Sequence, residues 1–574
     1  MDYSIKISGE AGQGIQTIGN TLARVFARSG LDVFTHQDYE SRIRGGHNFF
    51  YVRVSGKPVT AVREAVDILV ALDREGIVFH EKELSARGML IYDSSALGQV
   101  YERPHFLDIP FTNLAVEHGG GKITANTVAT GAVLGILGMG PDILEGIIRD
   151  TFRKKGDGIV NANINAAAAG HDYAVKHCRK CSFSVPPVSG PKMLIAGNDA
   201  IGLGALASGC RFYAGYPMTP STGIMLYLAG RADDRGIVVE QAEDEISAVN
   251  MALGASFAGV RAMTATSGGG FALMVEGLSL AAMTETPIVV ALAQRPGPAT
   301  GLPTRTEQAD LEFALYAAHG EFPRAVFAPG TPEQAFHLTQ RAFDIAEKYQ
   351  IPAVILTDQY LADSLWTFES FDPGRTAYTE YRLKGDAFKS LPGYRRHEFT
   401  DSGVSPLAVP GDAEHVVVTD SDEHDEEGHI TEDAGTRVNM LRKRLFRKLP
   451  LIRQEMEPPL FYGDDNPRVV IAGWGSTYGV MKEAVDLLSG DMSIAMLHFS
   501  AICPFPSTAK FDYLSILNNA DVSVCVENNA TGQFARLMRA GTGYEFSAGI
   551  NKYDGRPFTL EGLGGEIDAV AGGL

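Results

Sequence analysis

The chain has 574 residues, of which 45% are hydrophobic and 21% are charged, and its formal net charge at pH 7 is −19. This length exceeds what one hydrophobic core supports and predicts about three or four domains. The negative charge argues against nucleic acid or an anionic membrane as a partner. No apolar run approaches the roughly 18 residues of a membrane-spanning helix, and the first residues do not form a basic and then apolar leader, so we expect a cytoplasmic protein.

Strand-like and helix-like segments alternate through the first part of the chain. A helical window, IQTIGNTLARVFARS, follows the first strand-like segment, and the strand-like segments are YSIKIS, LDVFTHQ, NFFYVRVS, VDILVAL and GMLIYD. This alternation is typical of an α/β domain with a largely parallel sheet, which we place at residues 1–180.

A glycine-rich turn joins the first strand to the first helix. Gly9, Gly12 and Gly14 have the spacing G-x-x-G-x-G, which is neither the dinucleotide-binding fingerprint nor the nucleotide-triphosphate loop. Such a turn can bring backbone N–H groups to an anion, but a tight turn without a ligand is an equal alternative. Downstream, Arg42 and Arg44 precede two glycines and suit a phosphate-rich ligand, unless they are solvated loop residues.

The chain contains only five cysteines. An odd and sparse set predicts no disulfide framework. Cys178 and Cys181 form a lone C-x-x-C, and one pair cannot complete a four-thiolate zinc or iron–sulfur site. We interpret them as two thiols of a linker, so any iron–sulfur cluster would have to be carried by a partner.

Two further α/β domains and a connecting region follow a proline-containing linker. KMLIAG opens a second domain at residues 192–370, and RVVIAGWGS marks a third at residues 456–574. Between them, residues 371–455 contain an acidic run at 419–433 and a basic helix at 439–449. We interpret the acidic run as a solvated loop, with a metal site as the alternative.

Three strand ends of the second domain carry candidate functional side chains. AGYPMTPST presents Thr219 on a loop made rigid by two prolines. In EQAEDEIS, Glu245 is a candidate catalytic carboxylate, although acids also favour a helix N-terminus through its dipole. Arg295 and Arg305 flank a stiff loop rich in glycine and proline, where an arginine fork suits a substrate carboxylate; ordinary surface arginines are the alternative.

Several motifs together resemble the α subunit of 2-oxoacid:ferredoxin oxidoreductases: GYPMTPST, EDEISAVNMALGAS, TATSGGG and ALAQRPGPATGLPT. GEAGQG and ESRIRGG look like the γ domain of that family, fused ahead of α. AGWGS and VCVENNATGQFARLMR resemble its transketolase C-terminal-type domain. The resemblance spans essentially the whole chain. It implies a multidomain α/β protein with a γ-type domain, a pyrimidine-type thiamine-diphosphate-binding domain and a transketolase C-terminal-like domain.

The resemblance also implies a reaction. Members of the family decarboxylate a 2-oxoacid on thiamine diphosphate, pass electrons singly through a [4Fe–4S] cluster to ferredoxin and transfer the acyl group to coenzyme A; the reverse reaction fixes CO2. EHDEEGHITED and LRKRLFRKL look like the forms usually assigned to 2-oxoglutarate. No asparagine pair follows the GDG at 156–158 at the distance of a diphosphate-binding loop, some two dozen residues, so we interpret it as a turn. The expected partners are a β subunit that holds the diphosphate, Mg2+ and the cluster, in an assembly of two αβ pairs, and ferredoxin.

The motifs assign roles to individual residues. By resemblance, Glu245 would face the ring nitrogen of the thiamine pyrimidine, Thr219 and Arg295 would hold the 2-oxoacid, and Arg305 would bind the second carboxylate of 2-oxoglutarate. Coenzyme A binding would involve Gly12, Gly14, Arg42 and Arg44. The alternatives are the same chemistry on another 2-oxoacid, branched-chain or pyruvate, a coenzyme A-dependent transferase without redox function, and a non-catalytic scaffold.

Overall fold

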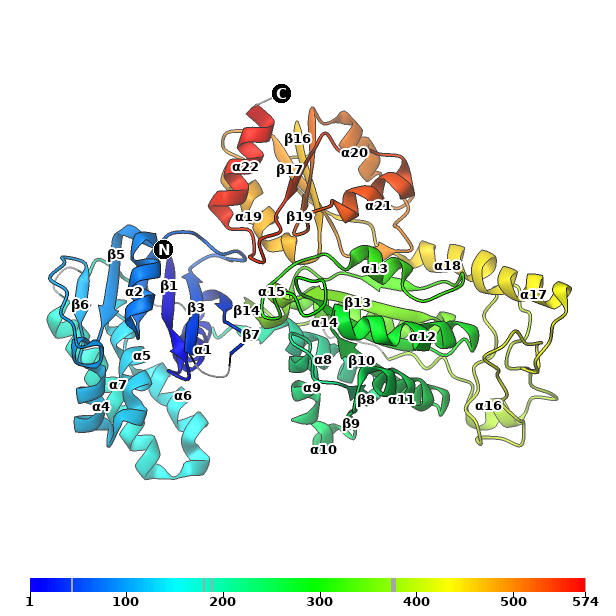
Figure 1. Cartoon of the computed structure of the whole chain (residues 1–574), viewed down its shortest axis with the longest axis horizontal. Coiled ribbons are helices and arrows are strands. Elements are labelled where there is room, and N and C mark those ends of the chain that lie inside the picture. The colour runs from blue at the N-terminus through cyan, green and yellow to red at the C-terminus, as the bar shows by residue number, and fades with distance from the viewer. Residues whose placement is uncertain (43–44, 179–180, 187, 189, 373–377, 573–574) are drawn as a thin grey trace. The chain divides into compact units, whose positions relative to one another are not determined.

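The computed structural model describes residues 1–42, 45–178, 181–186, 188, 190–372 and 378–572 (Figure 1). The chain divides into two compact units. The first unit comprises Met1–Ile195, Ser364–Ser370 and Thr559–Glu561, and the second comprises the remainder.

The first unit is built on an eight-stranded sheet with the order β6-β5-β4-β1-β3-β2-β14-β7. Its strands are β1 Asp2–Ala11, β2 Asp32–Asp38, β3 Gly45–Ser55, β4 Val66–Ala71, β5 Leu84–Tyr92, β6 Phe106–Asp108, β7 Met193–Ala196 and β14 Leu365–Phe368. The sheet is mixed, so the prediction of a largely parallel sheet is wrong for this unit. β1, β4, β5 and β6 are parallel neighbours, but β3 pairs antiparallel with both β1 and β2. A short connection between β2 and β3 leaves no room for a crossover helix, which a parallel pair requires.

Helices cover both faces of this sheet. The main core joins the alternate residues Ile5 and Ile7 of β1 to the apolar stripe of α1, which includes Ile18 and Leu22, and to α5 and α6. A smaller core lies between β4, β5 and α2. The helices are α1 Ile15–Arg28, α2 Arg74–His80, α3 Ser94–Leu97, α4 Phe111–Gly119, α5 Ala125–Ile136, α6 Asp142–Phe152 and α7 Asp157–His177, with short 3-10 helices at Glu81–Glu83, Lys122–Thr124 and Arg153–Lys155.

The second unit contains a seven-stranded sheet with the order β18-β12-β13-β11-β10-β8-β9. The strands are β8 Cys210–Gly215, β9 Val238–Gln241, β10 Arg261–Thr266, β11 Ile288–Gln294, β12 Ala325–Phe327, β13 Pro352–Asp358 and β18 Ala501–Cys503. All neighbours are parallel except β18, which pairs antiparallel with β12. The sequence IVVALAQ of β11 is buried at every position, as expected for a parallel strand covered on both faces.

A five-stranded sheet follows in the same unit, with the order β15-β17-β16-β19-β20. Its strands are β15 Leu460–Gly463, β16 Val469–Trp474, β17 Ile494–Phe499, β19 Val522–Glu527 and β20 Ala548–Asn551. One core is continuous between the two sheets and includes Leu292, Val326, Trp474 and Phe499. Because β18 comes from the C-terminal part of the chain but extends the seven-stranded sheet, the two sheets are also joined through their strands.

The remaining helices belong to the second unit or lead into it. They are α8 Gly197–Ala207, α9 Thr222–Ala229, α10 Ala232–Arg235, α11 Glu245–Phe257, α12 Gly268–Met283, α13 Leu311–Tyr316, α14 Pro332–Tyr349, α15 Gln359–Asp363, α16 Gly385–Lys389, α17 Ala434–Leu441, the π-helix η5 Arg442–Arg447, α18 Lys448–Glu455, the 3-10 helix η6 Gly475–Thr477, α19 Tyr478–Leu488, α20 Tyr513–Asn519, α21 Gln533–Thr542 and α22 Leu560–Gly572. Of the helices in the described ranges, none combines the length and apolar character needed to cross a membrane.

The connecting region is anchored by buried charges. Glu285, which follows α12, is 1% exposed, and its Oε1 lies 2.6 Å from Nζ of Lys443 and 3.3 Å from Nδ1 of His397. Its Oε2 accepts a hydrogen bond from Lys448. Burial alone would raise the pKa of Glu285, but the two ammonium groups hold it well below the usual range. Two lysines of the basic helix, Lys443 and Lys448, are therefore buried in the protein rather than exposed to solvent.

The acidic run differs from the predicted solvated loop at Glu423. This side chain is 13% exposed and accepts two hydrogen bonds from Arg444, at 2.6 and 2.8 Å, and it also pairs with Arg437. The acidic run and the basic helix are thus partners of each other, because a bidentate arginine–carboxylate pair satisfies both groups when water is excluded.

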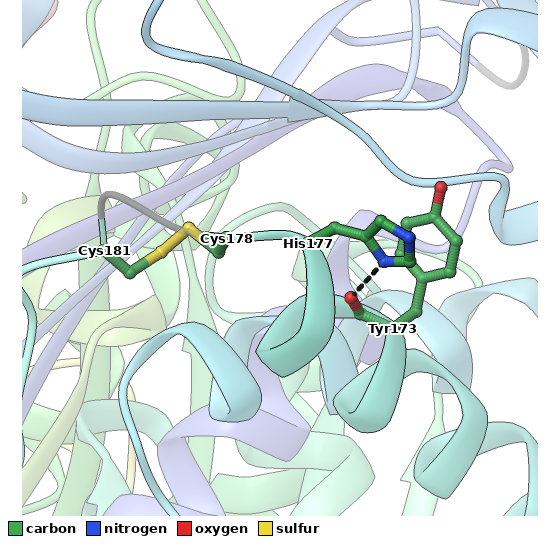
Figure 2. The surroundings of a disulfide bond; sticks show 4 residues. All are labelled: Tyr173, His177, Cys178 and Cys181. Atoms are coloured by element: carbon green, nitrogen blue, oxygen red, sulfur yellow. Dashed lines mark hydrogen bonds between the residues drawn. A yellow bond between two sulfur atoms is a disulfide. The ribbon is translucent and has the colours of Figure 1, made fainter.

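The C-x-x-C pair also differs from the sequence-based interpretation. Cys178 and Cys181 are joined by a disulfide, with their Cα atoms 5.5 Å apart, so the interpretation as two free thiols is wrong (Figure 2). Cys178 is the C-cap of α7, and its Cα atom lies at the separation from that of Cys181 that a disulfide needs.

Candidate functional site

Three strand ends of the seven-stranded sheet carry predicted site residues, and a fourth carries Ser267, which was not predicted from the sequence. Thr219 follows β8, Glu245 follows β9, Ser267 follows β10 and Arg295 follows β11. These strands are consecutive neighbours in the order β11-β10-β8-β9 and run parallel. The residues therefore lie along one edge of the sheet, where α/β proteins bind ligands.

The acidic cluster before α11 divides into residues with different roles. Asp244 is the N-cap and its side chain accepts the backbone N–H of Ser247 at 2.7 Å, the ordinary helix-capping use of an acid. Glu243 is exposed. Glu245 is the first residue of the helix and is only 3% exposed. Of the two explanations for the cluster, capping therefore accounts for Asp244 and leaves Glu245 unexplained.

Glu245 faces the N-terminus of α12. A Cβ atom placed on Gly270 would lie 2.4 Å from Oε1 of Glu245 and 2.0 Å from Oγ1 of Thr266, so only glycine allows this close approach. Oε1 of Glu245 is buried and has no hydrogen-bond partner among the described residues. A buried carboxylate oxygen normally has a donor. The arrangement fits a donor brought by a ligand, such as a ring N–H of the thiamine pyrimidine.

Arg295 and Thr219 are in direct contact. Nη1 of Arg295 donates to the backbone carbonyl of Thr219 at 2.7 Å, which joins the loop after β11 to the loop after β8. Burial lowers the pKa of Arg295, a guanidinium that remains cationic in proteins. The guanidinium has further N–H groups, which suit a carboxylate of a bound substrate.

A further acid, Asp310, lies at the same edge and was not singled out from the sequence. Its backbone N–H donates to Oε1 of Gln294 at 2.9 Å, and a Cβ atom on Gly268 would lie 2.6 Å from its Oδ2. Burial raises the pKa of Asp310 to about 6, and Arg295 acts in the opposite direction. Asp310 occupies the N-cap position of α13 without making a side-chain cap, so its sequence context resembles an ordinary helix start.

The loop between β11 and α13 is fixed by the five-stranded sheet. Nε2 of Gln308 donates to the carbonyl of Trp474 at 2.9 Å, and its Oε1 accepts the backbone N–H of Asn528 at 3.0 Å. The backbone of Gln308 also binds Asn528 and Asn529, at 2.7 and 3.2 Å. Arg305 lies in this loop against Gly555, where an added Cβ would be 3.3 Å from the Arg305 Cβ. The motif VENN thus positions the loop that carries Arg305.

The glycine turn of the first unit borders a cavity. Gly14 is the N-cap of α1 in the left-handed conformation, with φ 83°, and Gly12 has φ 96°. The cavity measures about 330 Å3 and its lining includes Gly12, Gly14, Asn48 and Arg42. The Arg42 side chain is 65% exposed and pairs with Glu40 at 2.9 Å. Arg44 lies outside the described residues. A helix N-terminus without an acidic first turn suits an anion.

Another cavity, of about 550 Å3, is unrelated to these residues. It is lined by Leu280 and Met283 of α12 and by Arg444 of the connecting region. Met283 is at the opposite end of the helix from Gly268, and the 16 residues of α12 span about 24 Å. Over the described ranges, no group of three or more His, Cys, Asp and Glu side chains is arranged to hold a metal ion.

Two family models match the chain. The model described as "Pyruvate flavodoxin/ferredoxin oxidoreductase, thiamine diP-bdg" matches residues 203–443, which include the sheet edge with Thr219, Glu245 and Arg295. The model described as "Pyruvate ferredoxin/flavodoxin oxidoreductase" matches residues 4–173.

A curated relative and a solved structure match over nearly the whole length, and a second relative matches over part of it. The 2-oxoacid:ferredoxin oxidoreductase subunit alpha of Saccharolobus solfataricus is 32% identical, over 99% of this chain and 98% of the relative. The 2-oxoglutarate synthase subunit KorA of Archaeoglobus fulgidus is 35% identical over 59% of this chain and 88% of its own length. The structure of 2-oxoglutarate:ferredoxin oxidoreductase from Magnetococcus marinus, with 2-oxoglutarate, coenzyme A and succinyl-CoA bound, superposes with a TM-score of 0.90 at 31% identity and covers 99% of both chains.

Proposed function

Because the chain belongs to the α subunits of the 2-oxoacid:ferredoxin oxidoreductases, we propose that its substrate is 2-oxoglutarate. The reaction takes 2-oxoglutarate, coenzyme A and oxidised ferredoxin to succinyl-CoA, CO2 and reduced ferredoxin, and it also runs in the CO2-fixing direction. The choice of substrate is supported by relatives named for 2-oxoglutarate and by a similar structure that binds it.

The observation that carries the proposal is the buried, unpartnered Oε1 of Glu245 beside the glycines of α12. When bound, thiamine diphosphate supplies the electron sink that a 2-oxoacid needs in order to lose CO2. Glu245 accepts the hydrogen bond of the pyrimidine ring nitrogen and so holds a proton at that atom. Arg295 pairs with the 2-oxoacid carboxylate, and Thr219, whose carbonyl orients Arg295, binds the 2-oxo end.

A second polypeptide completes the enzyme in this proposal. A β subunit binds the diphosphate and Mg2+ and carries the [4Fe–4S] cluster that reduces ferredoxin, and two αβ pairs form the assembly. No asparagine pair follows the GDG at 156–158 at the distance of a diphosphate-binding loop, which supports the assignment of the diphosphate site to the other chain. Activity is therefore expected only when both chains are present.

Replacing Glu245 tests the central residue. In the α–β complex, Glu245→Gln keeps the shape of the side chain but removes the carboxylate, and we expect kcat to fall about 10²-fold or more, the usual effect of losing such a group. Thermal unfolding should be nearly unchanged, and thiamine diphosphate should bind more weakly in a calorimetric titration. The exposed Glu243→Gln is the matched control and should behave as the unaltered protein. More than a tenth of the original kcat in Glu245→Gln would contradict the assignment.

Replacing Arg305 tests the substrate. If Arg305 binds the second carboxylate of the substrate, its removal leaves that carboxylate without a partner. A substrate with one carboxylate does not use Arg305 and should not be affected. We expect Arg305→Leu to raise KM about 10-fold or more for 2-oxoglutarate and to leave KM for 2-oxobutyrate nearly unchanged, in a viologen-reduction assay. Equal effects on both substrates would remove Arg305 from the site. A preference of the unaltered enzyme for pyruvate or a branched-chain 2-oxoacid would overturn the substrate and leave the reaction class intact.

A further inference from the structure

We propose that Cys178 and Cys181 form a reversible dithiol–disulfide site, which a protein dithiol reduces, and that its oxidised form fastens the end of α7 to the segment that leaves the first unit. Neither the reaction proposed above nor its site uses these residues. The distance between the two Cα atoms, the state of the other three cysteines and the contacts of the segment after Cys181 support the proposal.

The two cysteines lie at the C-terminus of a long helix. α7 has 21 residues and ends at His177, and the backbone N–H of Cys178 still donates to the carbonyl of Ala174 at 2.9 Å. The Cα atoms of Cys178 and Cys181 are 5.5 Å apart, inside the range that a disulfide requires (Figure 2). Both residues are half-buried and pack against the core of the first unit.

The other three cysteines are unsuited to thiol chemistry. Cys210 and Cys525 are buried, and Cys503 is half-buried. Burial raises the pKa of Cys210 to about 12 and that of Cys503 to about 11, and it raises the pKa of Cys525 well above its usual range. Since the thiolate is the reactive form, these thiols are inert near neutral pH. Among the five cysteines, only Cys178 and Cys181 form a disulfide that an external dithiol can reduce, and the other three thiols are poor nucleophiles for exchange with it.

The sequence around the pair is basic. Lys176 lies in the last turn of α7, and the two residues between the cysteines in the sequence are Arg179 and Lys180. Cations beside a cysteine favour its thiolate, whereas the partial charge of about −0.5 at a helix C-terminus acts in the opposite direction.

The disulfide begins a segment that is laid along the first unit. Phe183 packs edge-on against Tyr3, with ring centroids 5.4 Å apart. The N–H of Val185 donates to the carbonyl of Leu137 at 3.2 Å, and Lys192 pairs with Asp32 at 2.9 Å. These contacts are non-covalent and individually weak. The disulfide closes a short loop where α7 continues into this exit segment, and its reduction leaves that junction restrained only by the backbone and by such contacts.

The reaction is an ordinary thiol–disulfide exchange. A thiolate of the external dithiol attacks one sulfur of the Cys178–Cys181 bond, forms a mixed disulfide and releases the other sulfur as a thiolate. The second external thiol then displaces the remaining cysteine. Two electrons and two protons pass from the external dithiol to the protein, so the external partner leaves as a disulfide and the protein as a dithiol.

Counting thiols on the full chain tests the site. Of the five cysteines, we expect three to be alkylated by N-ethylmaleimide under denaturing conditions before reduction, and all five after treatment with dithiothreitol, as measured by intact mass. Oxidised glutathione should return the count of the reduced native protein to three. Cys181→Ser should show four both before and after dithiothreitol, whereas the control Cys210→Ser should lose one thiol and keep the redox response. Five thiols before reduction and again after oxidised glutathione would overturn the proposal.

Hydrogen exchange tests the fastening. In the full chain, we expect peptides that cover the last turns of α7 and residues 181–186 to exchange about 10-fold faster after reduction, because their opening is no longer restrained. Cys181→Ser should exchange at the fast rate in both conditions. Peptides of β10 in the second unit should not change and serve as an internal reference. Equal exchange of the α7 peptides in the oxidised and reduced protein would show that the bond fastens nothing and would overturn that part of the proposal.

Discussion

At the scale of single residues, Asp310 gives the candidate site a charge that changes near neutral pH. Burial raises the pKa of Asp310 to about 6, so its carboxyl is neutral below that pH and ionised above it. Arg295, the proposed partner of the substrate carboxylate, is the cation that interacts with Asp310. An ionised Asp310 therefore competes with a bound carboxylate for the same guanidinium, and a neutral Asp310 does not.

This competition predicts a pH-dependent KM. We expect KM for the 2-oxoacid to rise roughly 2- to 10-fold between about pH 5 and pH 7, as Asp310 ionises, a range that corresponds to about 0.4–1.4 kcal/mol. Asp310→Asn cannot ionise and should keep the low KM over the whole range, in steady-state kinetics of the α–β complex. The exposed Asp233→Asn, in α10, should retain the pH dependence. An unchanged pH dependence in Asp310→Asn would assign it to another group.

Glu245 is distinguished from the neighbouring acids by its burial. The sequence offers four acids in a row of six residues, and the resemblance selects Glu245 by position. The structure supplies a physical distinction that the sequence lacks: Asp244 caps α11, while Glu245 is buried with an unpartnered oxygen. Asp310 could not be selected in this way, because its burial depends on the loop after β11 and on Gly268 of α12.

At the scale of elements, the connecting region depends on Glu285. This residue follows α12, but its partners Lys443 and Lys448 lie 158 and 163 positions later in the chain, and each of the three side chains is 1% exposed. A buried ion pair is often worth little relative to apolar residues of the same size. Removing one partner is costly, because it leaves the other charges buried without compensation.

Glu285→Gln should therefore destabilise the second unit strongly. We expect a loss of about 3–5 kcal/mol, seen as earlier unfolding in urea and as faster proteolysis within residues 378–455. The exposed Glu414→Gln, in the same region, should have little effect. Replacing Glu285, Lys443 and Lys448 together by methionine should recover part of the stability, since these three charges are removed together and the buried Arg396 keeps its backbone hydrogen bonds to Thr284 and Glu285. If Glu285→Gln unfolds at the same urea concentration as the unaltered protein, the buried charges do not depend on Glu285 for stability.

At the scale of the whole molecule, the two units are expected to divide the substrates between them. We assign the 2-oxoacid to the second unit and coenzyme A to the glycine turn of the first unit, where α1 begins beside a cavity of about 330 Å3. The similar structure from Magnetococcus marinus has coenzyme A bound.

A double substitution tests that assignment. Arg42→Ala with Arg44→Ala removes two cations that would pair with the phosphates of coenzyme A, and we expect its Kd to rise about 10-fold or more, since charge-assisted pairs contribute above 1 kcal/mol each. Calorimetric titration of the α–β complex measures the change, and the 2-oxoacid KM should not alter. Lys57→Ala, at an exposed position of the first unit, is the control. An unchanged coenzyme A affinity in the double variant would show that coenzyme A does not bind through Arg42 and Arg44.

The sequence by itself determined the strands, the α/β class and the grouping of Thr219, Glu245 and Arg295. Periodicity and turn residues are local signals, and the carboxyl ends of neighbouring parallel strands meet at one edge wherever such a sheet forms. Only the tertiary structure decided the mixed sheet of the first unit and the buried partners of Glu285. The same holds for the fixing of Gln308 by Asn528 and for the Cys178–Cys181 bond. Except for the disulfide, these features join residues far apart in the chain; all of them depend on burial and on the path of the backbone, which no local pattern encodes.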